Sequence, residues 1–178
     1  MTLKGKRILI TGGSSGLGLA LATRLAGHNQ VALVARNADK LRQAEDSIRK
    51  QVPGAVVKGY AIDVTGPHAA EALSAIATEM NGLDVLINSA GILREGYFDS
   101  LELSVFRETM EINLFGTINA IQALLPFLEK SRGRILNVAS IAGMTGVFGY
   151  AAYCSSKFAL VGLTETLRYE LGPRGIIV

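Results

Sequence analysis

The sequence contains very little cysteine and histidine. Cysteine occurs once and histidine twice in 178 residues. The single thiol, Cys154, excludes an intrachain disulfide and any metal site built from several cysteines. We interpret it as a small, half-buried side chain. His28 and His68 have no second histidine or cysteine at ligand spacing, so we interpret both as surface residues and expect no metal site.

Long apolar runs and blocks of one charge are also missing. The first apolar segment, residues 7–11, is too short for a signal sequence or a membrane span, and no other stretch reaches spanning length without a charge. The net charge is +3, and the basic residues are scattered rather than gathered in a nucleic-acid-binding arm. We therefore expect a cytoplasmic protein, peripheral to a membrane at most, with no nucleic-acid partner.

The composition is that of a globular chain. Apolar residues make up 49% of the sequence and charged residues 19%. A chain of this length is expected to form one domain, so residues 1–178 are predicted to fold as a single unit with a substantial core.

Short β-branched runs alternate with longer helical patterns. The predicted strands are residues 7–11, 30–35, 55–60, 83–88 and 133–138, with a last one starting at 175–178. The predicted helices are residues 16–26, 38–50, 67–80, 104–129 and 151–171. Nearly all-apolar strands that alternate with helices predict a parallel sheet covered on both faces. The expected fold is a doubly wound, Rossmann-like α/β sheet in three layers.

Proline and glycine mark the expected helix ends. Pro67 suits the first turn of a helix, and Gly172 with Pro173 is expected to end another. Pro126 is expected to kink or terminate the helix 104–129. The sequence stops inside an apolar strand, which would leave an unpaired edge. We therefore expect the chain to be truncated after the start of its sixth strand.

A glycine-rich loop follows the first predicted strand. Glycines at such a loop allow a tight turn, close approach to a pyrophosphate and close helix–strand packing. The helix that follows would present free N–H groups to the phosphates. The alternative is an ordinary Gly/Ser turn. The candidate dinucleotide-binding residues of this loop are Thr11, Gly12, Ser14, Ser15, Gly16, Leu17 and Gly18.

The end of the second strand indicates which dinucleotide binds. An NAD site usually has an acidic residue there, but this chain has Ala35 followed by Arg36. A guanidinium can bind a 2′-phosphate with two hydrogen bonds, so NADP(H) is favoured over NAD(H). The alternative is a solvated Arg36. Asp63, with Val64, follows the third strand and is a candidate contact for the adenine, although Asp63 could instead only cap a turn.

A tyrosine and a lysine lie four residues apart near the start of the last helix. Tyr153 and Lys157 would share one helix face, where an ammonium favours the ionised phenol. Ser140 lies thirteen residues before Tyr153. Each of these also has a plain alternative: a loop serine, a tyrosine at a helix start and a solvated lysine. Their occurrence together with a phosphate loop favours acid–base chemistry.

Together these motifs resemble the short-chain dehydrogenase/reductase family across essentially the whole chain. Residues 11–18 resemble the family's TGxxxGxG loop, and residues 88–91 resemble its NNAG element, with Ser89 in place of the second Asn. The family's catalytic tetrad falls on Asn113, Ser140, Tyr153 and Lys157. The resemblance implies an oxidoreductase that acts on a ketone or secondary alcohol. It adds these cofactor contacts: Asn88, Ala90, Gly91, Tyr153 and Lys157.

The resemblance also implies a role for each member of the tetrad. Tyr153 would give a proton to the substrate oxygen as hydride arrives from the nicotinamide. Lys157 would promote ionisation of the phenol and hold the nicotinamide ribose, and Ser140 would hydrogen-bond the substrate oxygen. Asn113 would distort its helix locally, so that its main chain holds a water linking Lys157 to solvent. Taken alone, Asn113 could instead be a solvated helix residue.

A narrower likeness concerns the substrate. Residues 33–41 and 146–159 are similar to those of 3-ketodihydrosphingosine reductases, which implies reduction of 3-ketosphinganine with NADPH. The alternatives are a 3-oxoacyl or other carbonyl reductase of the same family and, from another class, a non-catalytic nucleotide-binding or scaffold protein. The family also implies a homodimer or homotetramer formed through the helices 104–129 and 151–171. The candidate substrate contacts are mostly apolar: Leu93, Tyr97, Ile141, Met144, Phe148 and Tyr150.

Overall fold

The structure, a computed structural model, describes residues 3–178 and contains a five-stranded parallel sheet. The strand order is β3-β2-β1-β4-β5. The strands are β1 Arg7–Thr11, β2 Gln30–Ala35, β3 Val56–Ala61, β4 Val85–Asn88 and β5 Arg134–Asn137. The predicted doubly wound, Rossmann-like α/β fold is confirmed, with strand limits that differ from the predicted ones by at most two residues.

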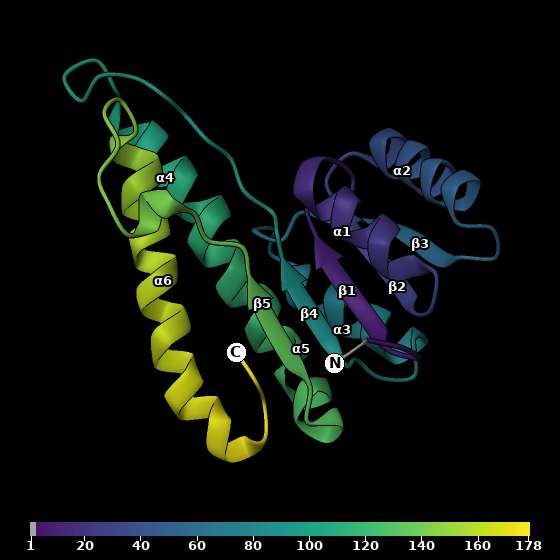
Figure 1. Ribbon diagram of the computed structural model, residues 1–178. Coiled ribbons are helices and arrows are strands. Elements are labelled where there is room, and N and C mark those ends of the chain that lie inside the picture. The colour runs from purple at the N-terminus through teal and green to yellow at the C-terminus, as the bar shows by residue number, and fades with distance from the viewer. Residues whose placement is uncertain (1–2) are drawn as a thin grey trace.

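Helices cover both faces of the sheet (Figure 1). They are α1 Gly16–Ala26, α2 Ala38–Gln51, α3 Ala69–Glu79, α4 Leu103–Met110, α5 Gly116–Ser131 and α6 Ala151–Leu171. Successive residues of a strand point to opposite faces, so β1 contributes to two separate cores. Ile8 and Ile10 pack with residues of α1 and α2, whereas Leu9 packs with residues of α3 and α5. This alternation produces the three layers.

The helix predicted at 104–129 is interrupted. α4 ends at Met110, a π-helical turn spans Glu111–Phe115, and α5 then runs to Ser131. Pro126 lies inside α5, so the expectation that it terminates the helix is wrong. A proline has no N–H, so Pro126 cannot donate to the carbonyl of Gln122, four residues earlier. Pro126 and Gln122 are both exposed, so water can hydrogen-bond to that carbonyl instead. The helix ends instead at Arg132, which is left-handed with φ 48°.

The residues that end the chain begin to pair with β5. Ile135 N–H donates to the Ile177 carbonyl at 2.8 Å, and Ile177 N–H donates to the Gly133 carbonyl at 3.1 Å. Arg134 and Ile177 form a parallel bridge. The segment predicted as the start of a sixth strand therefore lies next to β5. The preceding helix α6 ends before Gly172 and Pro173, as predicted.

A row of polar side chains connects the sheet to α6. Asn88 of β4 donates its amide to the Asn137 side-chain oxygen of β5 at 2.9 Å. Asn137 in turn donates to the Thr164 hydroxyl of α6 at 2.9 Å. Asn88 is 2% exposed, whereas Asn137 and Thr164 are half-buried. The row fixes how α6, which carries Tyr153 and Lys157, sits against the ends of β4 and β5.

Replacing Thr164 with alanine should destabilise the protein by about 1 kcal/mol, because the half-buried Asn137 amide loses its partner. Thr166→Ala is the matched control on the same helix. Both hydroxyls donate to the carbonyl four residues earlier, but Thr166 is exposed and accepts nothing from the sheet. Its loss should cost about 0.5 kcal/mol or less. Urea unfolding of the two variants measures the difference, and equal losses would contradict a role for the row.

Candidate active site

The loop between β1 and α1 requires glycine at two positions. Gly12 has φ +69°, and its N–H donates to the Val34 carbonyl of β2 at 2.8 Å. A Cβ at Gly12 would lie 2.7 Å from the Ala90 nitrogen, and one at Gly18 would lie 2.3 Å from the Gly12 carbonyl oxygen. Neither approach is possible for a side chain. The loop is therefore folded tightly against both β2 and the segment after β4.

The same loop leaves room and hydrogen-bond donors for an anion. Ser15 is the N-cap of α1, and its side chain makes no capping hydrogen bond, so the first N–H groups of the helix stay open. A Cβ at Gly16 would meet nothing within 4 Å. Thr11 connects the loop to the segment after β4, since its hydroxyl accepts hydrogen bonds from the N–H groups of Ser89 and Ala90 at 3.2 and 3.3 Å. These features fit a bound pyrophosphate.

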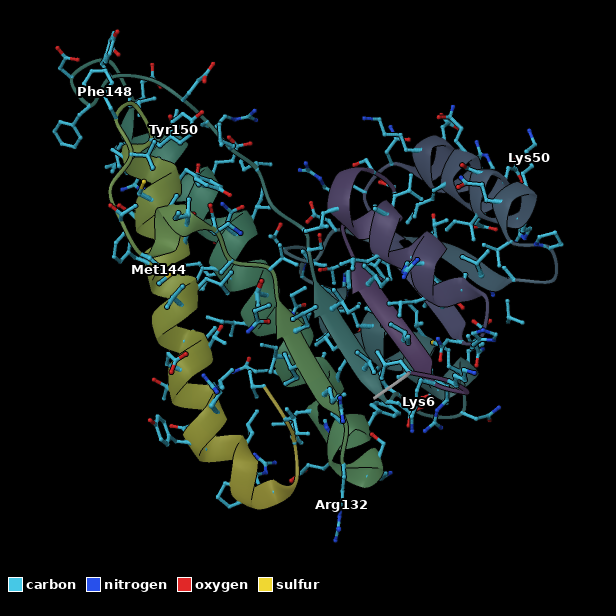
Figure 2. The ribbon with its side chains drawn as sticks, viewed as in Figure 1. Lys6, Lys50, Arg132, Met144, Phe148 and Tyr150 are labelled. Atoms are coloured by element: carbon cyan, nitrogen blue, oxygen red, sulfur yellow. The ribbon has the colours of Figure 1, made fainter. Side chains whose placement is uncertain are left out.

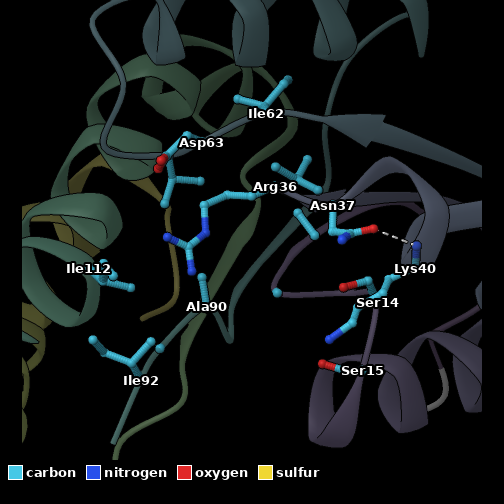
Figure 3. Close-up of a pocket in the computed structure, with 15 residues that line it drawn as sticks. Ser14, Ser15, Arg36, Asn37, Lys40, Ile62, Asp63, Ala90, Ile92 and Ile112 are labelled. Carbon is cyan, nitrogen blue, oxygen red and sulfur yellow. Dashed lines mark hydrogen bonds between the residues drawn. The ribbon is translucent and has the colours of Figure 1, made fainter. Parts of the chain in front are cut away.

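A hollow of about 220 Å³ extends from this loop along the ends of β2 and β3 (Figure 3). We call it the first hollow. Arg36 reaches into it from the end of β2, toward Asp63 and Ala90, and Ser14 lies on the opposite wall. Its lining residues are Gly12, Ser14, Ser15, Val34, Ala35, Arg36, Asn37, Lys40, Ile62, Asp63, Val64, Ala90, Gly91, Ile92 and Ile112.

Asp63 is held ionised in the first hollow. Burial opposes its ionisation, but hydrogen bonds from the Thr65 N–H and hydroxyl, at 3.0 and 2.7 Å, and the charge of Arg36 outweigh that effect. The pKa of Asp63 therefore lies below its ordinary value. Asp63 does cap a turn, which was the plain alternative, and its carboxylate also lines the hollow.

A second hollow of about 320 Å³ adjoins the first. Gly12, Ser15, Gly91 and Ile92 line both, so the two form one extended site across the loop. Tyr153 and Lys157 of α6 form part of its wall. The other residues that line only the second hollow are Gly16, Leu17, Ser89, Leu93, Val138 and Ala139.

Lys157 is a buried cation. Lys157 is 5% exposed, and its Nζ donates a hydrogen bond to the Val138 carbonyl at 2.8 Å. Burial lowers the pKa of this ammonium group. The Nζ lies 5.7 Å from the centroid of the half-buried Tyr153 ring. The predicted pair therefore shares one helix face and one hollow.

Asn113 joins three segments of the site. It is fully buried in the π-helical turn, which is the local distortion that the family resemblance implied. Its side chain accepts from the Ile92 N–H at 2.8 Å and donates to the Ile92 carbonyl at 2.9 Å. It also donates to the Ser156 hydroxyl of α6 at 2.9 Å. The plain alternative of a solvated helix residue is thus wrong.

Ser140 lies just after β5 and caps the short 3₁₀ turn Ile141–Gly143. Its Oγ accepts from the Ala142 N–H at 3.1 Å, which leaves the hydroxyl proton free to donate. The residue is half-buried and does not line either hollow. Contact between Ser140 and a substrate oxygen stays a prediction.

The other predicted contacts divide into two groups. Val64, Ala90 and Gly91 line the first hollow, whereas Thr11, Gly18 and Asn88 line neither hollow and instead support the loops. Sequence reasoning missed seven lining residues of the first hollow: Val34, Ala35, Asn37, Lys40, Ile62, Ile92 and Ile112. Of these, Lys40 had a usable signal, because it is a cation four residues after Arg36.

The predicted apolar substrate contacts lie mostly outside the hollows. Leu93 lines the second hollow, but Met144 and Phe148 are 77% and 86% exposed and project from the outer end of the molecule (Figure 2). The two loops that carry these residues are tied together. Gly96 N–H donates to the Gly149 carbonyl at 2.9 Å, and the Tyr97 and Phe148 rings meet edge to face at 5.5 Å.

The chain belongs to the short-chain dehydrogenase family: the family model described as "short chain dehydrogenase" matches residues 6–178. The chain thus has the Rossmann fold of a family of oxidoreductases whose members bind a nicotinamide cofactor. In the part of the chain that the structure describes, no helix has the length and apolar character needed to cross a bilayer. Nor do residues 3–178 contain a cluster of three or more His, Cys, Asp or Glu that could hold a metal.

Several relatives are similar along the whole of this chain. It is 37% identical to 3-ketodihydrosphingosine reductase from Bos taurus, over 100% of this chain and 55% of that protein. It is 34% identical to the 3-oxoacyl-(acyl-carrier-protein) reductase FabG of Vibrio cholerae, over 100% of this chain and 72% of that protein. The chain thus spans about half the length of its bovine relative.

Solved structures have the same fold. A variant of actinorhodin polyketide ketoreductase with NADPH superposes with a TM-score of 0.92 and 33% identity, over 98% of this chain and 68% of that one. An NAD⁺-bound xylitol dehydrogenase superposes with a TM-score of 0.90 and 32% identity, over 99% and 68%. Both cofactors thus occur among proteins of similar fold, so cofactor preference depends on particular residues.

The buried charge of Lys157 should make stability depend on pH. Because the native pKa is lowered, the native state loses this proton before the unfolded state does as pH rises. The buried charge therefore lowers the free energy of unfolding at neutral pH. This destabilisation disappears as the pH approaches about 10, the pKa of a free lysine, because the native state has then lost the proton. Lys157→Met removes this destabilisation at every pH.

The free energy of unfolding of Lys157→Met, minus that of the parent protein, should therefore fall as pH rises from about 7 to about 10. Urea unfolding at a series of pH values measures it. Lys130→Met, at an exposed lysine of α5, should show no such trend. A difference for Lys157→Met that does not change with pH would contradict the buried charge.

Proposed function

We propose that this protein is an NADP(H)-dependent oxidoreductase that interconverts a ketone and a secondary alcohol. The observation that supports this most directly is the extended site: Tyr153 and Lys157 line one end, and Arg36 reaches into the other. The glycine-rich loop lies between them.

The residues present fit a bound dinucleotide along this site. The loop and the start of α1 would hold the pyrophosphate, Asp63 would accept from the adenine amino group, and Arg36 would bind the 2′-phosphate. Lys157 would hold the nicotinamide ribose. When bound, the nicotinamide supplies or accepts the hydride.

The protein's own residues would handle the proton. In the direction of reduction, the Tyr153 hydroxyl donates its proton to the carbonyl oxygen as the carbonyl carbon gains a hydride, and an alcohol results. The neighbouring Lys157 ammonium stabilises the phenolate that this transfer leaves. The free hydroxyl proton of Ser140 is available to hydrogen-bond the substrate oxygen. Asn113 holds Ile92 and α6 in the positions that this chemistry needs.

For the substrate we propose 3-ketodihydrosphingosine. Two observations support it: the similarity to the bovine reductase across the whole chain, and the exposed apolar side chains of the loops beyond the second hollow. An acyl-chain ketone would match such a surface. The second candidate is a 3-oxoacyl thioester, favoured by the similarity to the Vibrio cholerae reductase, of which this chain covers a larger share.

Tyr153→Phe should lower turnover by about a thousandfold and leave NADPH binding almost unchanged, because only the transferable proton is removed. Oxidation of NADPH at 340 nm, with each of the two candidate substrates and with protein at its native length, measures turnover. Fluorescence titration measures binding. Tyr169→Phe is the control, since Tyr169 is an exposed tyrosine on the same helix. Full activity of Tyr153→Phe would refute the proposed proton donor.

Arg36→Ala should weaken NADPH binding by roughly 10- to 100-fold and NADH binding by less than about twofold, since only NADPH has a 2′-phosphate. The control is Arg42→Ala, because Arg42 pairs with Asp39 on the exposed side of α2. Fluorescence titration of both nucleotides gives the ratio. Equal losses for the two nucleotides would mean that Arg36 does not meet the 2′-phosphate.

A further inference from the structure

Lys40 lies on the wall of the first hollow that faces Arg36. It belongs to the first turn of α2, where its backbone N–H donates to the side chain of the N-cap Asn37 at 2.9 Å. Its side chain is directed toward Ser14 and Ser15, whereas Arg36 extends to the other side of the hollow (Figure 3). The turn at Asn37 thus places two cations of adjacent elements on opposite walls of one cavity.

The ammonium of Lys40 has no carboxylate partner. Among residues 3–178 no salt bridge or side-chain hydrogen bond includes it, and Asp39, the nearest acid in sequence, pairs with Arg42. The position does not favour a lysine for the stability of α2 either, because a cation in the first turn of a helix opposes the helix dipole. Lys40 is therefore an exposed cation at the edge of the hollow with no carboxylate partner among residues 3–178.

The position of Lys40 is suited to binding an anion whose charge Arg36 alone would not neutralise. A phosphate monoester carries between one and two negative charges near neutral pH, and one guanidinium supplies a single positive charge. Lys40 also borders a neighbouring hollow of about 260 Å³ between α1 and α2, with Ser14, Ser15, Leu19, Gln43 and Ala44. An anion beside Ser14 and Ser15 would therefore have Lys40 within reach on one side and Arg36 on the other.

We propose that Lys40 is a second cationic contact of the cofactor's 2′-phosphate, and so determines cofactor preference together with Arg36. This proposal rests on the proposed NADP(H) dependence. It assigns to Lys40 no part in proton or hydride transfer, because Lys40 lines the first hollow and not the second.

The test uses two fragments that differ by one phosphate: adenosine 2′,5′-bisphosphate and 5′-AMP. Calorimetric titration of Lys40→Ala should show about fivefold to tenfold weaker binding of the bisphosphate and unchanged binding of 5′-AMP. Lys40→Arg should retain most of the parent protein's affinity for the bisphosphate. Lys50→Ala is the matched control at the other end of the same helix and should change neither (Figure 2).

The outcomes separate this proposal from the one on which it rests. If the parent protein binds the bisphosphate no better than 5′-AMP, NADP(H) dependence fails, and Lys40 loses its role with it. If the parent protein prefers the bisphosphate and Arg36→Ala removes that preference but Lys40→Ala does not, only the role of Lys40 is overturned. A loss of 5′-AMP binding in Lys40→Ala would likewise overturn it, because a structural role would affect both fragments.

Discussion

Burial of the Lys157 ammonium is the constraint on which the rest of the site depends. A charge taken out of water is costly unless polar groups receive it, and here the Val138 carbonyl accepts from it at 2.8 Å. Close packing around this residue leaves room only for glycine at position 143 and little room for a Cβ at position 91. A Cβ at Gly143 would lie 2.7 Å from the Lys157 carbonyl oxygen, and one at Gly91 would lie 3.1 Å from the Asn113 side chain. The fold thus keeps a poorly solvated cation in place beside a phenol.

The topology explains why this cation and the glycine-rich loop meet. In the order β3-β2-β1-β4-β5 the chain reverses its direction of winding between β1 and β4. Ligands of open parallel sheets bind at the carboxyl ends of the strands at such a point. The loop after β1 and the segment after β4 line both hollows, and α6, tied to β4 and β5 through Asn137 and Thr164, brings Lys157 to the same edge.

Features governed by local sequence could be predicted from the sequence, and features governed by distant contacts could not. The strands and the glycine turn follow from apolar runs and from glycines that no other residue can replace. The π-helical turn was implied only by the family resemblance and not by the local pattern, because the Asn113 side chain hydrogen-bonds to Ile92 and Ser156, which are 21 and 43 residues away. α5 tolerates Pro126 because Gln122 is exposed to solvent, and the sequence pattern does not predict that exposure. Lys40 was missed although its position four residues after Arg36 was a usable signal, because only the fold shows that the first turn of α2 borders the first hollow.

In the proposed function, the first hollow selects the cofactor and the second carries the chemistry. Arg36 and Asp63 line only the first, and Tyr153 and Lys157 line only the second, while Gly12, Ser15, Gly91 and Ile92 line both. Side chains that share no partner usually contribute independently to free energy. Under the proposed function, a change at the end of β2 is therefore expected to alter which nucleotide binds without altering proton transfer. The residues that line both hollows cannot be changed so independently. A side chain at Gly12, for example, would collide with the backbone at Ser89 and Ala90 and so disturb both hollows at once. Such a division is consistent with the occurrence of NADPH-bound and NAD⁺-bound proteins among structures of similar fold.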